Sequence, residues 1–160
     1  MQKKVIAVII AILVIAAGIL AFVNRGGDEN KAGMVIISDD RNVTVAWDAI
    51  DAETFEGDLV NGKGETSHHE FTGAELVSIL EDNDVEVERD AEIKVTSEDN
   101  YSAELTGAEL LESGKVYVAL TDNGEMIEGI EGGQGAQLLV FGDPNSKRAV
   151  RYMKTVEVDD

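Results

Sequence analysis

The chain has 160 residues, with 32 Asp and Glu against 13 Lys and Arg, and its formal net charge is −19. Because 44% of the residues are hydrophobic, the composition excludes a disordered acidic polymer, and the negative charge excludes a nucleic-acid binder. There is no cysteine, which excludes disulfides and thiolate metal ligands.

The first predicted element is an uncharged apolar run at residues 5–23, long enough as a helix to cross the hydrocarbon core of a bilayer. Two lysines precede it, so the positive-inside rule places residues 1–4 in the cytoplasm. A cleaved signal peptide is the alternative, but its apolar region is usually shorter, about 7–15 residues. We therefore expect an uncleaved signal anchor in the cell membrane, a linker at residues 24–33 and one extracytoplasmic domain at residues 34–160.

The expected domain consists mostly of strands. In its first half, β-branched and alternating apolar runs predict strands at residues 34–38, 43–47, 53–60 and 66–71, with a turn at residues 61–64. In its second half, they predict strands at residues 93–95, 101–105, 116–121, 125–130, 138–141 and 152–158. Asn123-Gly124 lies between two of these runs and predicts a hairpin turn.

Two short helices are predicted by a pentapeptide, Thr-Gly-Ala-Glu-Leu, that occurs at residues 72–76 and again at residues 106–110. In each copy the Thr and the Glu have the spacing of a capping box, so each copy predicts a helix start, with ends near Asp82 and Gly114. A tandem repeat is excluded because the residues between the copies do not repeat. The expected fold class is α+β, a mixed β-sheet domain with two short helices, preceded by a single transmembrane helix.

The order of these segments resembles the molybdopterin-binding domain of sulfite-oxidase-like oxidoreductases, over roughly residues 35–158. The segments that carry the resemblance are Phe71–Leu76 with Ile79-Leu80, Val95–Tyr101 with Asn100 at a usual Gly, Asp122–Gly124, Gly132-Gly133, Leu138–Val140 and Arg151–Val158. The resemblance implies that fold. It also implies a cofactor site in which a Cys just before a turn like Asn61-Gly62 would bind molybdenum, and in which Gly132–Gln137 would contact the pterin.

The departures from the family bear on function. The Cys is missing, and Gln134 and Gln137 stand where the family has Pro and Arg, which removes a bidentate guanidinium contact to the cofactor phosphate. The resemblance therefore supports the scaffold and argues against the chemistry. We expect no catalytic or metal-ligating residues and no bound cofactor, molybdopterin being implied by the resemblance alone.

Two segments are candidates for anion binding. The segment Gly132–Gly135 could hold an anion through its backbone N–H groups, or could be a turn before a buried strand. The basic cluster of Lys147, Arg148, Arg151 and Lys154 could bind a phosphate or carboxylate, or could neutralise acidic neighbours. The candidate cofactor-binding residues are Asn61, Gly132, Gly133, Gln134, Gly135, Gln137, Lys147, Arg148 and Arg151.

The histidines do not predict a metal site. His68 and His69 are adjacent on a predicted strand, so they point to opposite faces, and two exposed histidines are expected in place of a shared ligand set. No Ser–His–acid set is recognisable along the chain, so a serine hydrolase is not expected. Acidic runs such as residues 81–84 lack the spacing of a calcium loop and predict a solvated acidic face.

These observations favour a membrane-anchored extracytoplasmic binding or accessory module without molybdenum catalysis. Its expected partners are the membrane and another membrane or extracytoplasmic protein. Two alternatives remain open. One is a redox subunit that retains a pterin or another anionic cofactor, and the other is an acidic structural surface protein that binds divalent cations.

Overall fold

The computed structural model describes residues 32–39, 41–144 and 146–159. The expected signal anchor at residues 5–23 and all but the end of the expected linker lie outside these described residues. Within them, no helix has the length and apolarity needed to cross a membrane.

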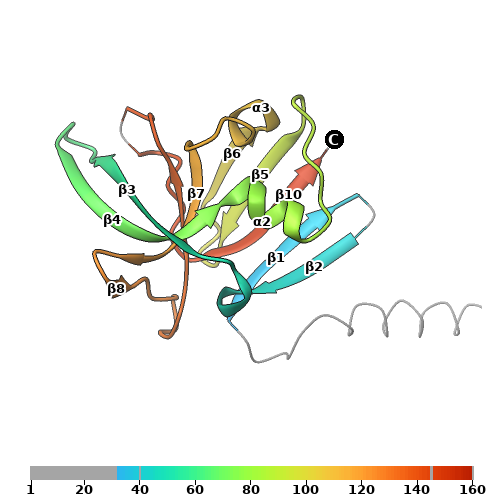
Figure 1. Ribbon diagram of the computed structural model, residues 1–160, viewed down its shortest axis with the longest axis horizontal. Coiled ribbons are helices and arrows are strands. Elements are labelled where there is room, and N and C mark those ends of the chain that lie inside the picture. Colours follow the sequence, from blue (N-terminus) through green and yellow to red (C-terminus); the bar gives the residue numbers. More distant parts are fainter. Residues whose placement is uncertain (1–31, 40, 145, 160) are drawn as a thin grey trace, which may run out of the picture.

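The described residues form two β-sheets and two short α-helices (Figure 1). The strands are β1 (Gly33–Ser38), β2 (Arg41–Ala46), β3 (Glu53–Val60), β4 (Thr66–Glu75), β5 (Glu92–Ser97), β6 (Ser102–Thr106), β7 (Val116–Asp122), β8 (Glu125–Met126), β9 (Gln137–Val140) and β10 (Met153–Asp159). The helices are α2 (Leu76–Asp82) and α3 (Gly107–Leu110), and a 3-10 turn, η1 (Trp47–Ala49), follows β2.

The first sheet has the order β2-β1-β10-β5-β6. In this sheet β1 and β10 are parallel, whereas the other three pairs of neighbouring strands are antiparallel. The second sheet has the order β3-β4-β7-β8, and β9 also pairs with β7. Figure 1 shows the two sheets side by side, with α2 following directly from the end of β4. The expected class, α+β with a mixed sheet and two short helices, is confirmed for the described residues.

The main hydrophobic core lies between the two sheets and under α2. Fully buried side chains from both sheets and the helix meet in it, among them Ile36, Val95, Val156, Val118, Leu138 and Leu80. The opposite face of the second sheet carries a smaller cluster, in which Phe71 and Leu139 are buried and Phe55, Tyr117 and Phe141 pack around them. Both faces of the second sheet are therefore partly apolar. One face packs against the main core, and the other carries the smaller aromatic cluster.

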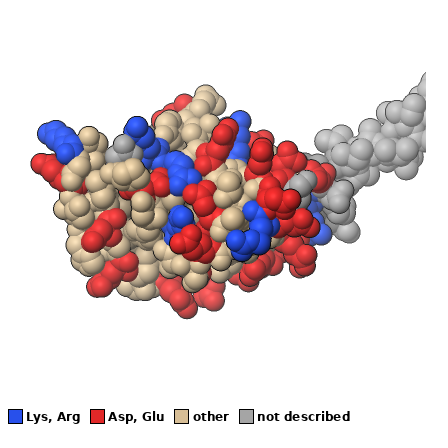
Figure 2. All heavy atoms as spheres, turned by 90° about the horizontal axis from the view of Figure 1, so that it is seen from above, with Lys and Arg blue, Asp and Glu red and all other residues tan. Residues whose placement is uncertain are grey.

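On the face drawn in Figure 2, acidic side chains are spread over much of the domain, with basic ones interspersed. On the first sheet, exposed Lys94 of β5 stands in register with Glu104 of β6 and with Glu157 of β10. Opposite charges on neighbouring strands stabilise a sheet by roughly 0.2–1 kcal/mol per pair. Lys94 is thus placed between two carboxylates of neighbouring strands.

Several predicted elements match the structure closely. β3 has the predicted bounds, and Asn123 (φ 49°) and Gly124 (φ 80°) form the predicted hairpin turn between β7 and β8. Asn100 also has a positive φ, 65°, so it occupies a left-handed position where Gly is the usual residue. The local turn chemistry of these segments was sufficient to predict them.

The first copy of the pentapeptide contradicts the prediction of a capped helix at residue 72. β4 continues through Glu75, and the helix starts only at Leu76 without a side-chain cap. Tertiary contacts explain why the helix does not start at residue 72. Thr72–Glu75 pair with β7, and the Glu75 carboxylate accepts a hydrogen bond from the backbone N–H of Gly114. Strand pairing has therefore overridden the capping signal.

The second copy does form the predicted capping box. The Thr106 N–H donates to the Glu109 carboxylate (3.0 Å), and the Glu109 N–H donates to the Thr106 hydroxyl (3.3 Å). The helix is short, ending at Leu110 rather than near Gly114. The same five residues thus form a strand end in one place and a helix start in another.

Other differences are at the ends of elements. β1 begins at Gly33, inside the expected linker, because Gly33 pairs with Ala46. β8 ends at Met126 rather than at residue 130, because Glu128 and Gln134 bridge and the chain between them forms a separate turn. β2, β9 and β10 each differ from the prediction by one or two residues at an end.

We predict that Thr106→Ala lowers the free energy of unfolding by about 1 kcal/mol, because the first turn of α3 loses its cap. Urea denaturation measures this. Thr72→Ala is the matched control, since Thr72 occupies the same place in the other copy but caps no helix, and it should cost about half as much or less. Equal losses of unfolding free energy in the two variants would contradict the role of Thr106 as a helix cap.

Candidate functional site

A cavity of about 440 Å³ opens where the β3–β4 turn meets the loop after β5 and the segment before β10. It is lined by Leu59, Val60, Asn61, Ser67, Asp99, Tyr101, Gln137, Ser146, Ala149 and Arg151. Of the nine candidate residues from the sequence, the structure brings three together here, Asn61, Gln137 and Arg151.

These three side chains differ in what they can offer a ligand. Asn61 is used by its own turn, because its amide donates to Glu65 (2.7 Å) and its oxygen accepts the backbone N–H groups of Lys63 and Glu65. Within the described part of the chain, the side chains of Gln137 and Arg151 make no hydrogen bond. Gln137 and Arg151 are therefore the donors free to bind a ligand.

The cavity also contains one carboxylate. The hydroxyl of buried Ser97 donates to Asp99, and this bond, with a further one from the Tyr101 N–H, lowers the pKa of Asp99 below its usual value. Asp99 is accordingly charged at neutral pH, so its charge offsets that of Arg151. The charged side chains that line the cavity are therefore balanced despite the acidity of the domain.

The glycine-rich segment lies elsewhere and has a structural role. The N–H of Gly132 donates to Gly129 and that of Gly135 donates to Ile127, so both groups are used within the turn. Gln134 points inward and its amide donates to the carbonyls of Leu120 (3.0 Å) and Gly135 (2.7 Å). The segment thus forms a turn before β9, one of the two roles that the sequence allowed for it.

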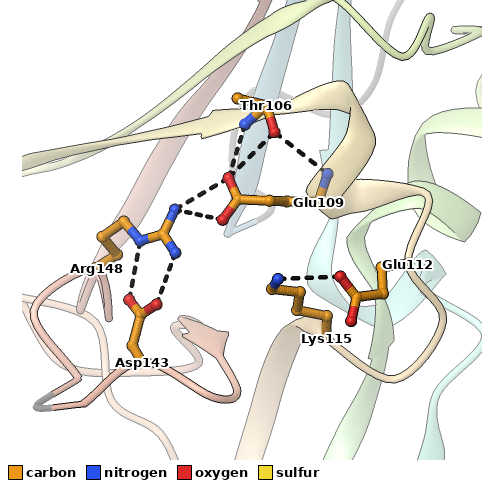
Figure 3. Close-up of polar contacts among 6 residues, drawn as sticks. All are labelled: Thr106, Glu109, Glu112, Lys115, Asp143 and Arg148. Carbon is orange, nitrogen blue, oxygen red and sulfur yellow. Dashed lines mark hydrogen bonds and ion pairs between the residues drawn. The ribbon is translucent and has the colours of Figure 1, made fainter.

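Arg148 is the centre of an ion-pair clamp (Figure 3). Its guanidinium donates two bonds to Asp143, at 2.9 and 2.6 Å, and contacts both carboxylate oxygens of Glu109, at 2.9 and 3.1 Å. The bonds from Arg148 lower the pKa of Asp143. Burial raises the pKa of Glu109, but its bonds from the Thr106 N–H and Arg148 outweigh this and leave it below its usual value. Arg148 is thus occupied by two carboxylates.

The clamp holds one wall of the cavity. Asp143 and Arg148 belong to the segment between β9 and β10 that also supplies Ser146 and Ala149 to the cavity. The carbonyl of Lys147, in the same segment, accepts a hydrogen bond from the Tyr101 hydroxyl. Of the expected basic cluster, only Arg151 faces the cavity, while Arg148 and the Lys147 backbone keep its wall in place.

A hydrogen-bonded chain of Ser67, His69 and Asp122 lies at the edge of the cavity, and sequence analysis did not find it. The Ser67 hydroxyl lies 2.8 Å from Nε2 of His69, and Nδ1 of His69 lies 2.7 Å from the Asp122 carboxylate. Ser67 itself lines the cavity. The expectation that the chain contains no Ser–His–acid set is therefore wrong for the described residues.

A β-bulge brings Asp122 into this chain. β4 and β7 pair with one register from Gly73–Ala119 onward, but Thr72 pairs with Thr121, so Leu120 is left without a partner. A shift of one residue moves all later side chains to the other face of a strand. Because of the bulge, Asp122 shares a face with His69, from which 53 residues separate it.

The two histidines differ in environment. The side chain of His68 is 64% exposed and pairs with Asp58 at 2.7 Å, whereas that of His69 is 21% exposed and stacks on Phe71 with ring centroids 5.5 Å apart. The two rings lie on opposite faces of β4, as expected from their adjacency. The expectation that both are exposed holds for His68 and fails for His69.

We predict that the pKa of His68 lies above its usual value, because its hydrogen bond to Asp58 favours the charged ring. Desolvation of the ring opposes this, and the charges of Asp58 and Glu56 add to the rise. A raised folded-state pKa stabilises the fold below the unfolded value, and this contribution is lost as pH rises through the folded value. An NMR titration of the ring protons measures the pKa. In Asp58→Asn it should fall towards about 6.5, and an unchanged value would contradict the pairing.

Metal ligation receives no support from side-chain geometry. Among the residues that the structure describes, no three His, Asp or Glu side chains converge in a way that could hold a metal ion. The acidic runs of the sequence lie on the surface as separate charges.

The chain matches no protein-family model, and no curated protein matches it at a significant level. Among solved structures, the fold is similar to the sulfane dehydrogenase SoxCD from Paracoccus pantotrophus, with a TM-score of 0.64 and 12% sequence identity. The match covers 80% of this chain and 38% of the SoxCD chain, so this chain spans well under half of that protein's length. The similarity supports the oxidoreductase-domain fold that the sequence resemblance implied, and at this identity it concerns the fold alone.

Proposed function

We propose that the protein is a membrane-anchored extracytoplasmic binding module, in which a molybdopterin-domain-like scaffold holds a small anionic molecule without molybdenum chemistry. The observation that carries this proposal is the free donor pair of the cavity, Gln137 and Arg151, in a site whose other walls are already fixed by internal hydrogen bonds. A guanidinium and an amide that line one cavity suit a carboxylate or phosphate group.

The residues of the cavity do not fit a molybdenum cofactor. The family resemblance would place the sulfur ligand beside the Asn61 turn, and the cavity wall there is formed by Val60. Among the residues that the structure describes, no sulfur or imidazole side chain lines this cavity. In the described part of the chain, Arg151 is the one cation that lines the cavity.

The anchoring part of the proposal is supported by the apolar run at residues 5–23 with two lysines before it. In this arrangement residues 1–4 lie in the cytoplasm and the domain lies outside the cell membrane. The module would there contact another membrane or extracytoplasmic protein. No specific observation favours a redox subunit or a divalent-cation-binding surface protein over this role.

Two measurements on the purified full-length chain test the proposal. Elemental and pterin analysis should find neither molybdenum nor pterin in stoichiometric amount, and calorimetry should detect binding of inorganic phosphate or acetate. Arg151→Ala should abolish that binding, whereas Arg89→Ala, which removes an exposed arginine outside the cavity, should leave it unchanged. Stoichiometric molybdenum, or binding that survives Arg151→Ala, would overturn the proposal.

A further inference from the structure

We propose that Ser67, His69 and Asp122 form a nucleophilic site that hydrolyses small carboxylic esters. Ser67 is the nucleophile, His69 is the general base, and Asp122 is a positioning residue that acts through His69. The inference goes beyond the proposed binding function, because its nucleophile, base and positioning residue are side chains that the binding function does not use. Ser67 opens into the same cavity.

The direction of the hydrogen bonds suits this chemistry. Asp122 is a carboxylate and can only accept, so Nδ1 of His69 is the protonated nitrogen and Nε2 carries the lone pair. Nε2 faces the Ser67 hydroxyl at 2.8 Å, within reach for removal of its proton. The order hydroxyl, Nε2, Nδ1, carboxylate is the arrangement by which unrelated folds activate a serine.

Packing holds the imidazole in this orientation. Ser67, His69 and Phe71 alternate along one face of β4, and the His69 ring lies almost parallel to that of Phe71, at 8°. Gly57 is the register partner of His69 on β3, and Phe141 packs against Gly57 closely enough to fill the space of a Cβ. The base is therefore partly buried against the ring of Phe71, while the nucleophile is exposed to the cavity.

The cavity indicates the class of substrate. Its apolar lining comes from Leu59, Val60 and Ala149, which suit a short acyl chain. The free donors of Gln137 and Arg151 line the same space and can stabilise the negative charge that develops on a carbonyl oxygen during attack. A volume of about 440 Å³ admits a small ester.

The reaction balances with water as its only co-reactant. The Ser67 oxygen attacks the ester carbonyl and its proton passes to Nε2 of His69. The bond to the leaving oxygen breaks, and that alcohol takes the proton from His69, which leaves an acyl group on Ser67. A water molecule, deprotonated by His69, then attacks the acyl group, and Ser67 regains its proton as the carboxylic acid departs.

The first test uses a fluorophosphonate probe and p-nitrophenyl acetate with the full-length chain. Mass spectrometry should find one label per chain, on Ser67, and none in Ser67→Ala. Both labelling and ester hydrolysis should fall at least about 100-fold in His69→Asn and in His69→Gln. Asp122→Asn should lower kcat for p-nitrophenyl acetate with little change in KM, a split that a merely structural role would not produce.

Matched controls are available on the same strand and outside the cavity. His68→Asn removes a histidine that also pairs with an aspartate but contacts no serine, and Ser102→Ala removes an exposed serine of β6 that does not line the cavity. Both should retain full labelling, and circular dichroism should show that every variant is folded.

Absence of labelling in the wild type, labelling spread over several serines, or full activity in both His69 variants would overturn the inference. Failure here leaves phosphate or acetate binding through Arg151 unaffected, and failure of that binding leaves the labelling of Ser67 unaffected. The two proposals can therefore be rejected separately.

Discussion

Gly73→Ala should lower the free energy of unfolding by about 3 kcal/mol or more, because β4 and β7 approach each other at this residue without space for a side chain. A Cβ at Gly73 would lie 1.9 Å from the carbonyl oxygen of Val118 and 2.9 Å from the Cα of Ala119. Both are backbone atoms of the paired strand, so the clash can be relieved only by moving β7. The movement would disturb the bulge that directs Asp122 to His69.

Gly62→Ala is the control, because a Cβ there meets nothing within 4 Å and the residue lies in an exposed turn. It should change the free energy of unfolding by less than about 0.5 kcal/mol. Urea denaturation followed by circular dichroism measures both variants. If Gly73→Ala unfolds at the same urea concentration as Gly62→Ala, the result would contradict the close approach of β4 and β7 at Gly73.

Arg148→Met should cost about 2–3 kcal/mol, because it leaves the carboxylates of Asp143 and Glu109 without their shared counter-charge. The side chains of Asp143 and Glu109 are only 13% and 22% exposed, so water screens their repulsion poorly. The same change should make the segment between β9 and β10 more sensitive to proteolysis. Arg148→Met is thus expected to lower the stability of the fold, whereas Arg151→Ala is expected to abolish ligand binding.

Lys115→Met provides the comparison, since Lys115 forms one ion pair, with exposed Glu112 at 3.0 Å, and acts on Asp143 only through its charge, without a hydrogen bond to it (Figure 3). Its expected cost is about 0.5 kcal/mol or less. Arg148→Lys should be intermediate, because it keeps the charge but cannot make the two parallel bonds to Asp143. A cost for Arg148→Met no larger than that for Lys115→Met would show that the clamp contributes little.

The clamp also predicts a dependence on pH. The pKa values of Asp143 and Glu109 are lowered in the folded state, so their stabilising contribution is fully present above the unfolded values of about 4 and is lost as pH falls through the folded values. The difference in stability between wild type and Arg148→Met should be constant between about pH 5 and 8 and should shrink below about pH 4. A difference that grows in acid would contradict the assignment.

Local signals in the sequence predicted the elements that depend on neighbouring residues. The hairpin at Asn123-Gly124, the bounds of β3 and the capping box at Thr106 all follow from chemistry within a few residues. The first pentapeptide copy shows where such signals fail. Its Thr and Glu have the same spacing, but the pairing of Thr72–Glu75 with β7 decides their conformation.

The candidate site was harder to predict for the same reason. Arg151 and Gln137 were identified from pattern and resemblance, and they do share a cavity. The Ser67–His69–Asp122 chain depends on the pairing of β4 with β7 and on one bulged residue, which no local pattern encodes. The alternation Ser67-x-His69 was the one available signal, because residues two apart on a strand share a face.

The parallel pair at the centre of the first sheet has a mechanical consequence. The chain enters β1 at Gly33 at one end of the sheet, and β10 ends at Asp159 at the other, with register pairs from Val35–Thr155 to Ser38–Val158 between them. Tension applied between a tether before Gly33 and a load after Asp159 would pull the two strands past each other lengthwise. Their hydrogen bonds would then bear the force together instead of opening one at a time, so the domain would resist stretching along that direction.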